Sequence, residues 1–530
     1  MLGYEYIFPT PAEYEVVRQQ LETAGFTAWL MPILLLINVY VYRSLKATFA
    51  SISISISPKK GPSSSRLQIL ARRIHWNLTQ PLNQTLGPPS RLLAAFAYLF
   101  YLVYIAQADT GKSYLHLTKS LGHVAVSQLP WHYLLAIKSP NSPITIATGL
   151  THERLNAWHR ILGRIIAVLA FGHAALYLKF FVDMGVLKKR LGDWEPRLGL
   201  AAVVTMAGLV VGSLAVVRRK SYYRGFYVGH VLMSAALVVE LWLHMRWTRR
   251  YVAQMGAWWV VNAVLRARQV KAVEASVIEE ASDADGLIVL KLGSKDAVID
   301  TWIPGQHVYI RLADGVIGST VGRKNPFTIA DVSKDATQLT LVARKLAGTT
   351  AMLKNCHNKA ILLEGPYGEA AEYMPSLIKA GKSAGLITLY AAGVGATYIL
   401  PIYLALLKAR GDTVDLRMKW FVKTPADAVW GVDLLRRAEK RVFVSLFLTR
   451  AQSGWRGKYK FDVPGLVVHD EREERGSVRR ISSMQRSDKE VTVMVCGPPG
   501  FSAQLRAEIG RYVKFGTRVV WYEEEFGFGG

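Results

Sequence analysis

The chain has 530 residues, of which 51% are hydrophobic, and it carries a formal net charge of +26. The length allows about three domains, and the apolar composition, with its positive mean hydropathy of +0.18, indicates a membrane protein with a soluble part. Two cysteines, Cys356 and Cys496, are too few for a disulfide framework or a CxxC metal site, and the sequence lacks the zinc-finger and RNA-binding signatures that would make nucleic acid an expected partner.

Residues 1–90 are expected to form one membrane span followed by a basic, serine-rich linker. The apolar segment 26–42 is just long enough to cross a bilayer. The Ser-Ile repeat at 51–57 alternates like a strand, but it has no partner strand nearby, so it is interpreted as low-complexity linker.

Residues 91–266 are expected to form a multi-pass α-helical membrane domain, which gives a bundle of six or seven helices. The expected spans after the first are residues 92–108, 117–137, 157–181, 198–217, 225–246 and 251–265. The second of these six is the weakest prediction, because Pro130 and several polar residues interrupt it.

Two of these spans carry histidine pairs with the same spacing. His159 and His173 are fourteen residues apart, and so are His230 and His244. Fourteen residues are nearly four helical turns, so each pair lies on one helix face. Two such helices side by side place His159 level with His230, and His173 level with His244, where each level can bind the iron of one b-type haem. A lone intramembrane histidine is often only a packing residue, but the repeated spacing favours ligation.

The distribution of Lys and Arg predicts the orientation in the membrane. Basic residues follow the first span, precede the sixth and follow the last, which places these parts in the cytosol. The basic loop 188–190 disagrees with this orientation. The first haem level then lies near the cytosolic leaflet, and the sequence does not distinguish the endoplasmic reticulum from the plasma membrane.

The soluble half is expected to contain two domains. Residues 267–375 are expected to form a small antiparallel β-barrel, because 270–292 and 300–312 alternate like strands between Gly and Asp turns. Residues 383–530 alternate between strand and helix patterns, which is typical of a parallel nucleotide-binding sheet. Residues 469–490, rich in Arg, Glu and Ser, are expected to be a surface insertion.

Two soluble motifs, Pro304–Val308 and Asn325–Ala330, are spaced as in the flavin domain of ferredoxin-reductase-like enzymes. Together with the histidine pairs, they make the chain resemble the ferric reductase and NADPH oxidase superfamily, most closely its short fungal metalloreductases. The resemblance implies FAD contacts from Asn325, where the family carries His, and from Pro326, Phe327, Thr328, Arg344, Gly348 and Thr350.

Further residues resemble the segments of that family that close the flavin domain and bind NADPH. They are Gly365 and Gly368, Gly393 and Gly395 of a Gly-rich turn that is one Gly shorter than usual, Cys496, Gly497 and Pro498 beside the nicotinamide, and Phe528 or Phe526 as the aromatic that stacks on the flavin. Lys423 and Arg450 end two predicted strands, where they are candidates to bind the 2′-phosphate of NADP. Each also has a plainer interpretation, such as a buried Cys before a tight turn or a surface charge.

The resemblance implies electron transfer from cytosolic NADPH through FAD and two b-type haems to an acceptor across the membrane. A ferric or cupric chelate as acceptor makes the protein a metalloreductase. Two alternatives stay open. One is a superoxide-producing NADPH oxidase that uses O2. The other is a membrane scaffold that keeps the fold without turnover, which Asn325 and the shortened Gly-rich turn suggest.

Overall fold

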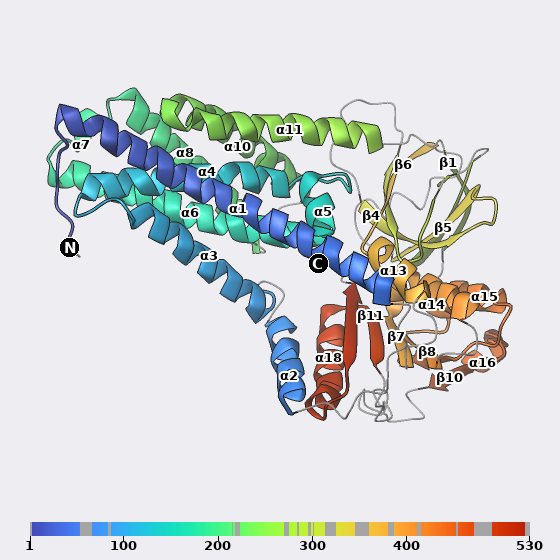
Figure 1. Ribbon diagram of the computed structural model, residues 1–530. Coiled ribbons are helices and arrows are strands. Elements are labelled where there is room, and N and C mark those ends of the chain that lie inside the picture. The colour runs from blue at the N-terminus through green and yellow to red at the C-terminus, as the bar shows by residue number, and fades with distance from the viewer. Residues whose placement is uncertain are drawn as a thin grey trace. The chain divides into compact units, whose positions relative to one another are not determined.

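The chain divides into two compact units, Met1–Gly61 with Ser90–Gln269, and Pro62–Pro89 with Val270–Gly530. Each is described by itself from a computed structural model (Figure 1). The structure describes residues 3–53, 66–82, 86–214, 216–217, 223–269, 275–282, 286–294, 298–299, 301–312, 325–344, 360–379, 386–410, 415–451, 454–470 and 490–524.

The first unit is a helical bundle. They are α1 (Pro11–Ser53), α3 (Pro89–Gln107), α4 (Tyr114–Leu135), α5 (Pro143–Thr148), α6 (His152–Asp183), α7 (Leu187–Arg190), α8 (Trp194–Gly212), α10 (Tyr223–His244), η1 (Arg246–Thr248) and α11 (Arg249–Gln269). Among the described residues, five helices (α1, α3, α6, α8 and α10) are long and apolar enough to cross a membrane. The expected helical membrane bundle is therefore confirmed.

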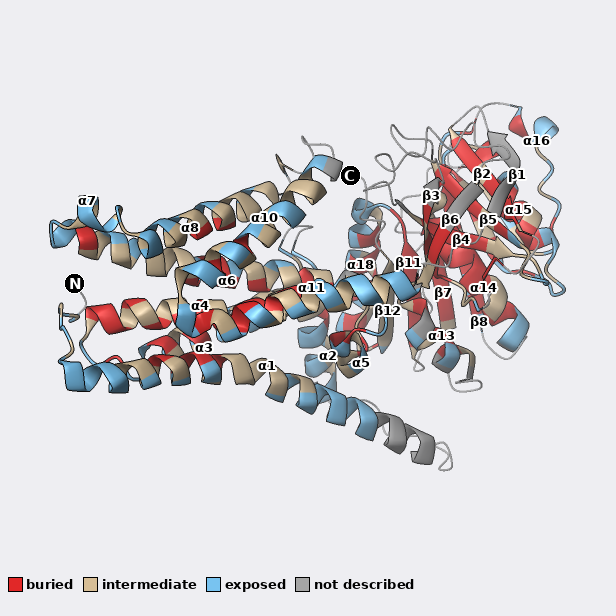
Figure 2. Cartoon of the chain, turned by 90° about the horizontal axis from the view of Figure 1, so that it is seen from above, coloured by how far each residue is buried: buried red, intermediate tan, exposed pale blue. Residues whose placement is uncertain are grey.

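Helix α4, predicted as the weakest span, is instead the central helix of the bundle. It packs against α1, α6 and α11, and most of its residues are buried (Figure 2). Its polar side chains bond within the bundle: Gln128 donates to the Ala28 carbonyl at 2.9 Å and accepts from the Tyr98 hydroxyl at 2.5 Å. Because these groups are satisfied by protein, α4 does not need the apolar surface of a lipid-facing span.

Within its longer segment, Val270–Gly530, the second unit begins with a closed antiparallel barrel, as expected. Its strands are β1 (Ala275–Ser282), β2 (Leu287–Gly293), β3 (His307–Leu312), β4 (Asn325–Val332), β5 (Gln338–Arg344) and β6 (Ala360–Tyr367), in the order β1-β2-β5-β4-β3-β6. Alternate residues of β2, such as Ile288, Leu290 and Leu292, are fully buried in the barrel core.

A parallel sheet of six strands follows, which confirms the α/β prediction. The strands are β7 (Leu386–Ala392), β8 (Asp415–Val422), β9 (Val444–Leu448), β10 (Leu466–Asp470), β11 (Val491–Cys496) and β12 (Val519–Glu524), and the helices are α13 (Ala370–Lys379), η4 (Gly393–Gly395), α14 (Ala396–Arg410), η6 (Ala426–Ala428), α15 (Val429–Arg436), α16 (Trp455–Lys458) and α18 (Pro499–Lys514). The order β10-β9-β8-β7-β11-β12 reverses between β7 and β11. Ligands of such sheets bind at this reversal, outside the carboxyl ends of the strands.

Two expectations about irregular segments were wrong in part. Arg66–Thr79 of the expected linker forms a helix, α2, which packs against α18 in the second unit. The first residues of the expected insertion, His469 and Asp470, belong to β10, whereas 471–489 lie outside the described residues. Both elements are short, and their apolar residues reveal a buried face only once a partner element is known.

Candidate functional site

The structure brings the first pair of histidines together. His159 on α6 and His230 on α10 have ring centroids 6.4 Å apart, with their planes at 62°. Two metal–nitrogen bonds of about 2 Å on opposite sides of one iron place the ring centres roughly 6 Å apart. The observed separation therefore fits two imidazoles that share a metal. His173 and His244, the second pair, lie on the same two helices, α6 and α10.

Backbone carbonyls of α4 orient the two histidines of α6. His159 Nδ1 lies 3.0 Å from the His132 carbonyl oxygen, and His173 Nδ1 lies 2.7 Å from the Thr118 carbonyl oxygen. A carbonyl only accepts hydrogen bonds, so Nδ1 is the protonated nitrogen in each ring. The lone pair of Nε2 is then left for a ligand, as in metal-binding histidines whose other nitrogen bonds to the protein.

Helix α8 and the residue that follows it orient the two histidines of α10 in the same way, by placing an acceptor next to each Nδ1 atom. His244 Nδ1 donates to the Glu195 carbonyl at 2.8 Å. His230 Nδ1 lies 3.4 Å from the Ser213 hydroxyl, which itself donates to the Leu209 carbonyl at 2.7 Å and is therefore free to accept from the ring. All four rings thus have Nδ1 directed at an acceptor.

Glycines leave room for two of the rings. A Cβ at Gly122 would lie 2.7 Å from the His173 ring, and one at Gly199 would lie 2.6 Å from the His244 ring. Both distances are shorter than real Cβ contacts. These two positions therefore admit the imidazoles only because they carry no side chain.

Two further histidines, which sequence reasoning missed, lie beside the pairs. The His132 ring stacks on the His159 ring with centroids 3.8 Å apart and planes at 13°. His123 is buried and interacts electrostatically with His173. Their Nδ1 atoms are buried and have no hydrogen-bond partner among the described residues. Because His123 and His132 are nine residues apart, the fourteen-residue spacing did not mark them.

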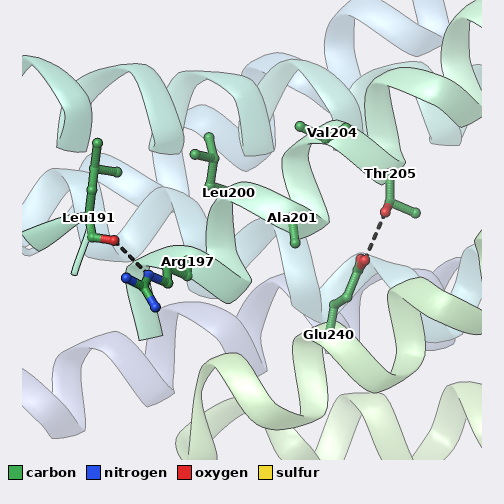
Figure 3. A pocket seen from close by; sticks show the side chains of 7 residues that line it. All are labelled: Leu191, Arg197, Leu200, Ala201, Val204, Thr205 and Glu240. Atoms are coloured by element: carbon green, nitrogen blue, oxygen red, sulfur yellow. Dashed lines mark hydrogen bonds between the residues drawn. The ribbon is translucent and has the colours of Figure 1, made fainter. Parts of the chain in front are cut away.

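An open groove lies between α8 and α10. It has a volume of about 540 Å³ and is lined by Leu191, Arg197, Leu200, Ala201, Val204, Thr205 and Glu240 (Figure 3). The Thr205 hydroxyl donates to Glu240 Oε1 at 2.9 Å, while Glu240 Oε2 is buried without a partner among the described residues. Glu240 is one turn from His244, so it is a candidate polar residue beside the second pair. No cluster of three potential metal ligands occurs in the described part of the chain.

The barrel gathers the predicted flavin motifs on three adjoining strands. In the register of β4 with β3, Pro326 pairs with Tyr309, Phe327 with Val308 and Thr328 with His307. Phe327 and Thr328 are buried, and Asn325 begins β4.

Strand β6 passes close to the turn before β3. Gly368 has φ +133°, and a Cβ there would lie 3.3 Å from the Gly305 carbonyl oxygen. Gly365 has φ +140°, and a Cβ there would lie 3.2 Å from the His307 carbonyl oxygen. Both positions require glycine, which explains why the predicted closing segment carries two of them.

Arg344, the predicted pyrophosphate cation, is the last residue of β5. Its side chain is 33% exposed and pairs with the buried Asp427 carboxylate at 3.9 Å. The other Asp427 oxygen accepts from the Thr424 amide at 3.2 Å. Of its predicted companions, Gly348 and Thr350 lie outside the described residues.

The two predicted nucleotide turns meet at the carboxyl edge of the sheet. Gly395 lies so close to the Cys496 carbonyl that a Cβ would overlap it, and a Cβ at Gly497 would lie 2.9 Å from the Ala392 Cβ. Gly393, with φ +57°, begins the turn that leads into α14. Close backbone approach beside a helix N-terminus is the arrangement that suits a phosphate group.

Cys496 is fully buried at the end of β11. Burial, with a smaller contribution from the carboxylates of Glu524 and Glu523, raises the pKa of its thiol well above the usual range. This favours the protonated form of the thiol. Pro498 precedes α18, and Phe528 and Phe526 lie outside the described residues.

Lys423 and Arg450 lie side by side, as their predicted role requires. They follow β8 and β9, and the Arg450 amide donates to the Lys423 carbonyl at 2.8 Å. Both residues are exposed, so two cations flank the same sheet edge as the turns.

Three tyrosines at this edge had no signal in the sequence. The rings of Tyr373 on α13 and Tyr522 on β12 have centroids 4.6 Å apart, and the hydroxyls of Tyr373 and Tyr398 share a hydrogen bond. Burial raises the pKa of Tyr398 well above its usual range, so it remains a neutral phenol. The three are far apart in the chain, and only the fold brings them together.

Two family models match the chain. Residues 121–241 match the ferric reductase like transmembrane component, and residues 269–371 match an FAD-binding domain. Each match covers only part of the chain, so it shows a ferric reductase like transmembrane component and an FAD-binding domain within it. Together with the five helices that are long and apolar enough to cross a membrane among the described residues, these matches support an oxidoreductase that is a flavoprotein and an integral membrane protein.

The chain has relatives among fungal proteins. It is 25% identical to a probable metalloreductase AIM14 of Candida tropicalis over 74% of this chain and 69% of the relative. It is 24% identical to the ferric reductase transmembrane component 1 of Schizosaccharomyces pombe over 58% of this chain and 60% of that protein. The chain thus spans roughly two thirds of the length of these relatives.

Among solved structures, the chain is similar to a flavohemoglobin from Malassezia yamatoensis with bound FAD and heme. The identity is 16% and the TM-score 0.38, over 77% of this chain and 97% of that chain. It is also similar to the cytochrome b5 reductase domain of Ulva prolifera nitrate reductase, with 17% identity and a TM-score of 0.32 over 48% of this chain and 97% of that chain.

Proposed function

We propose that this protein carries electrons across a membrane from NADPH, through FAD and two b-type haems, to a ferric or cupric chelate. The observation that carries the proposal is the arrangement of the first histidine pair. Its ring centroids are 6.4 Å apart, and both Nδ1 atoms are directed at acceptors.

The four histidines hold the haem irons in this proposal, with His159 and His230 at one level and His173 and His244 at the other. A bound haem with two imidazole ligands exchanges one electron at a time, and a bound flavin accepts a hydride and passes on its two electrons singly. The protein fixes the rings through the carbonyls of α4 and α8 and keeps the remaining space dry with apolar side chains.

In the second unit, β4 and the turn before β3 hold the flavin, with Arg344 as the cation for its pyrophosphate. The support is that Pro326 of β4 pairs with Tyr309 of β3, and that Gly368 directly follows β6, which pairs with the other side of β3. The Gly393–Gly395 turn and the start of α14 hold the nucleotide phosphates. Lys423 and Arg450 bind the 2′-phosphate and favour NADPH over NADH.

The acceptor is proposed from the relatives, whose names describe metalloreductases and ferric reductases. The cytosolic position of the second unit is proposed from the Lys and Arg distribution. A superoxide-producing oxidase remains the competing function.

Purified protein in nanodiscs tests the proposal. Dithionite should develop two reduced b-haem spectra, and NADPH should develop the same spectra more slowly. Haem bands that form with dithionite but never with NADPH would favour a scaffold without turnover. Ferric chelate under nitrogen should then reoxidise the haems, and superoxide formation in air without metal reduction would identify the oxidase instead.

A further inference from the structure

Helix α2 has two apolar faces, and only one of them is covered in the second unit. The covered face rests on α18: Trp76 is 7% exposed, and a Cβ at Gly510 of α18 would lie 2.7 Å from its indole nitrogen. Arg506 of α18 lies over the Trp76 ring at 4.7 Å and donates to the Thr79 hydroxyl at 2.9 Å. Trp521 of β12 meets Trp76 edge-on at 5.8 Å.

Basic side chains of α2 strengthen this contact at the end of α18. Arg72 donates to the Gly516 carbonyl at 2.8 Å, and Arg73 Nε donates to the Lys514 carbonyl at 3.0 Å. Cations at a helix C-terminus also interact favourably with the helix dipole. One face of α2 is therefore fixed to the nucleotide-binding part of the chain (Figure 1).

The opposite face carries an exposed apolar stripe. Leu67 is 77% exposed, Leu70 52% and Ile74 50%. At about 100° per residue these three, with the exposed Ala71, cover an arc of about 100°, and Trp76 lies half a turn away from Leu67. A stripe of this width on a helix that is already docked by its other side needs a second covering partner.

The position of α2 in the chain and its charge identify that partner as a bilayer surface. The spanning helix α1 precedes it, and the spanning helix α3 begins at Pro89, ten residues after Thr79, a reach of at most about 35 Å. No Asp or Glu occurs between Glu22 and Asp109, whereas Lys or Arg occurs at positions 43, 46, 59, 60, 66, 72, 73 and 91. Apolar stripes flanked by cations bind anionic lipid surfaces.

We propose that α2 is an interfacial helix. Its Leu67, Leu70 and Ile74 face enters the headgroup region of an anionic bilayer, while its Trp76 face holds α18. This helix then ties the nucleotide-binding part of the protein to the membrane surface. The proposal requires an integral membrane protein and does not depend on haem binding or turnover.

The test uses the full chain in phosphatidylcholine nanodiscs with and without phosphatidylserine. A spin label is introduced through a genetically encoded amino acid at position 67, 70 or 74, and at the exposed flank positions 68 and 75 as matched controls. Collision rates with oxygen, which is enriched in lipid, and with a water-soluble nickel complex report the surroundings of each label. Gel filtration of every labelled protein as a single peak verifies that it folds.

At 67, 70 and 74 we expect a higher oxygen-to-nickel ratio than at 68 and 75, and a lower ratio without phosphatidylserine. Labels at 67, 70 and 74 that favour nickel as strongly as the controls would overturn the proposal, because the stripe would then face water. Protection from both reagents would also overturn it, since protein would then cover the stripe. Ratios that do not change without phosphatidylserine would overturn the choice of an anionic surface.

Discussion

Adding one methyl group beside a haem ligand tests the proposed ligation more sharply than removing the ligand. Gly199→Ala places a Cβ 2.6 Å from the His244 ring, and Gly122→Ala places one 2.7 Å from the His173 ring. Both changes leave all four histidines in place. Each added methyl group contacts a ring of the second pair, His173 and His244, and not a ring of the first pair.

The size of the effect follows from the contact distances. Ordinary contacts begin at 3.4 Å, so the His244 ring must move by about 0.8 Å, the difference between 3.4 and 2.6 Å. Its Nδ1 bond to the Glu195 carbonyl, now 2.8 Å, resists that movement. Overpacking of this kind costs about 1–3 kcal/mol. If the whole cost falls on the loaded site, affinity for the haem drops by roughly fivefold to 150-fold.

Two neighbouring glycines provide matched controls. Gly172 and Gly229 directly precede His173 and His230 in the chain, yet a Cβ at either position meets nothing within 4 Å. Gly→Ala inside a helix is otherwise favourable by about 1 kcal/mol. Gly172→Ala and Gly229→Ala should therefore be neutral or slightly stabilising.

The assay counts haem per protein by the pyridine haemochrome method and follows a potentiometric titration of each variant. Gly199→Ala and Gly122→Ala should lose or shift one of two haem components and leave the other unchanged. The controls should keep both. Two unaltered components in Gly199→Ala and Gly122→Ala would refute the assignment of His173 and His244.

Three further predictions concern other residues. Replacing Lys423 and Arg450 together by Ala should raise KM for NADPH about tenfold with little change in KM for NADH. Steady-state kinetics with both nucleotides measures this difference. An equal rise of KM for both nucleotides would contradict 2′-phosphate binding. Burial lowers the pKa of Lys419 to about 8, so the unfolded chain binds more protons between about pH 8 and 10.5 and stability rises with pH in that window. Lys419→Met should therefore raise the unfolding temperature at pH 7, and this gain should fade when the pH exceeds the ordinary pKa of lysine. A gain that persists at such a pH would have another cause. His132→Ala removes the ring stacked on His159 but keeps the backbone carbonyl that accepts a hydrogen bond from His159. Both haems should therefore stay bound while the midpoint potential of one of them shifts, and His132→Phe should restore that potential. Loss of a haem would show that the stacked ring is essential for binding.

The sequence predicted the elements whose chemistry repeats along the chain. The fourteen-residue spacing located His159 and His173 on one helix and His230 and His244 on another, because helical periodicity is a local property. The motif order likewise located the barrel and the parallel sheet, since Gly-rich turns follow strands in both.

What the sequence could not predict depends on partners distant in the chain. The carbonyls of Thr118 and Glu195 orient histidines, yet a carbonyl belongs to every residue and leaves no mark in a sequence. Helix α4 was predicted as the weakest span because polar residues such as Gln128 look unsuited to a membrane until their hydrogen-bond partners are known. Helix α2 was missed because Trp76 becomes a core residue only against α18.

The two carbonyls that α4 offers to α6 are themselves fourteen residues apart, at Thr118 and His132, and they serve His173 and His159 in reverse order. The two antiparallel helices therefore match along their lengths, so a shift of α4 along its axis would disturb the orientation of both histidines of α6, and with them both proposed haem sites. Insertions or deletions between 118 and 132 should be far less tolerable than substitutions there. A substitution changes a side chain but leaves the distance between the Thr118 and His132 carbonyls unchanged, whereas an insertion or deletion changes that distance.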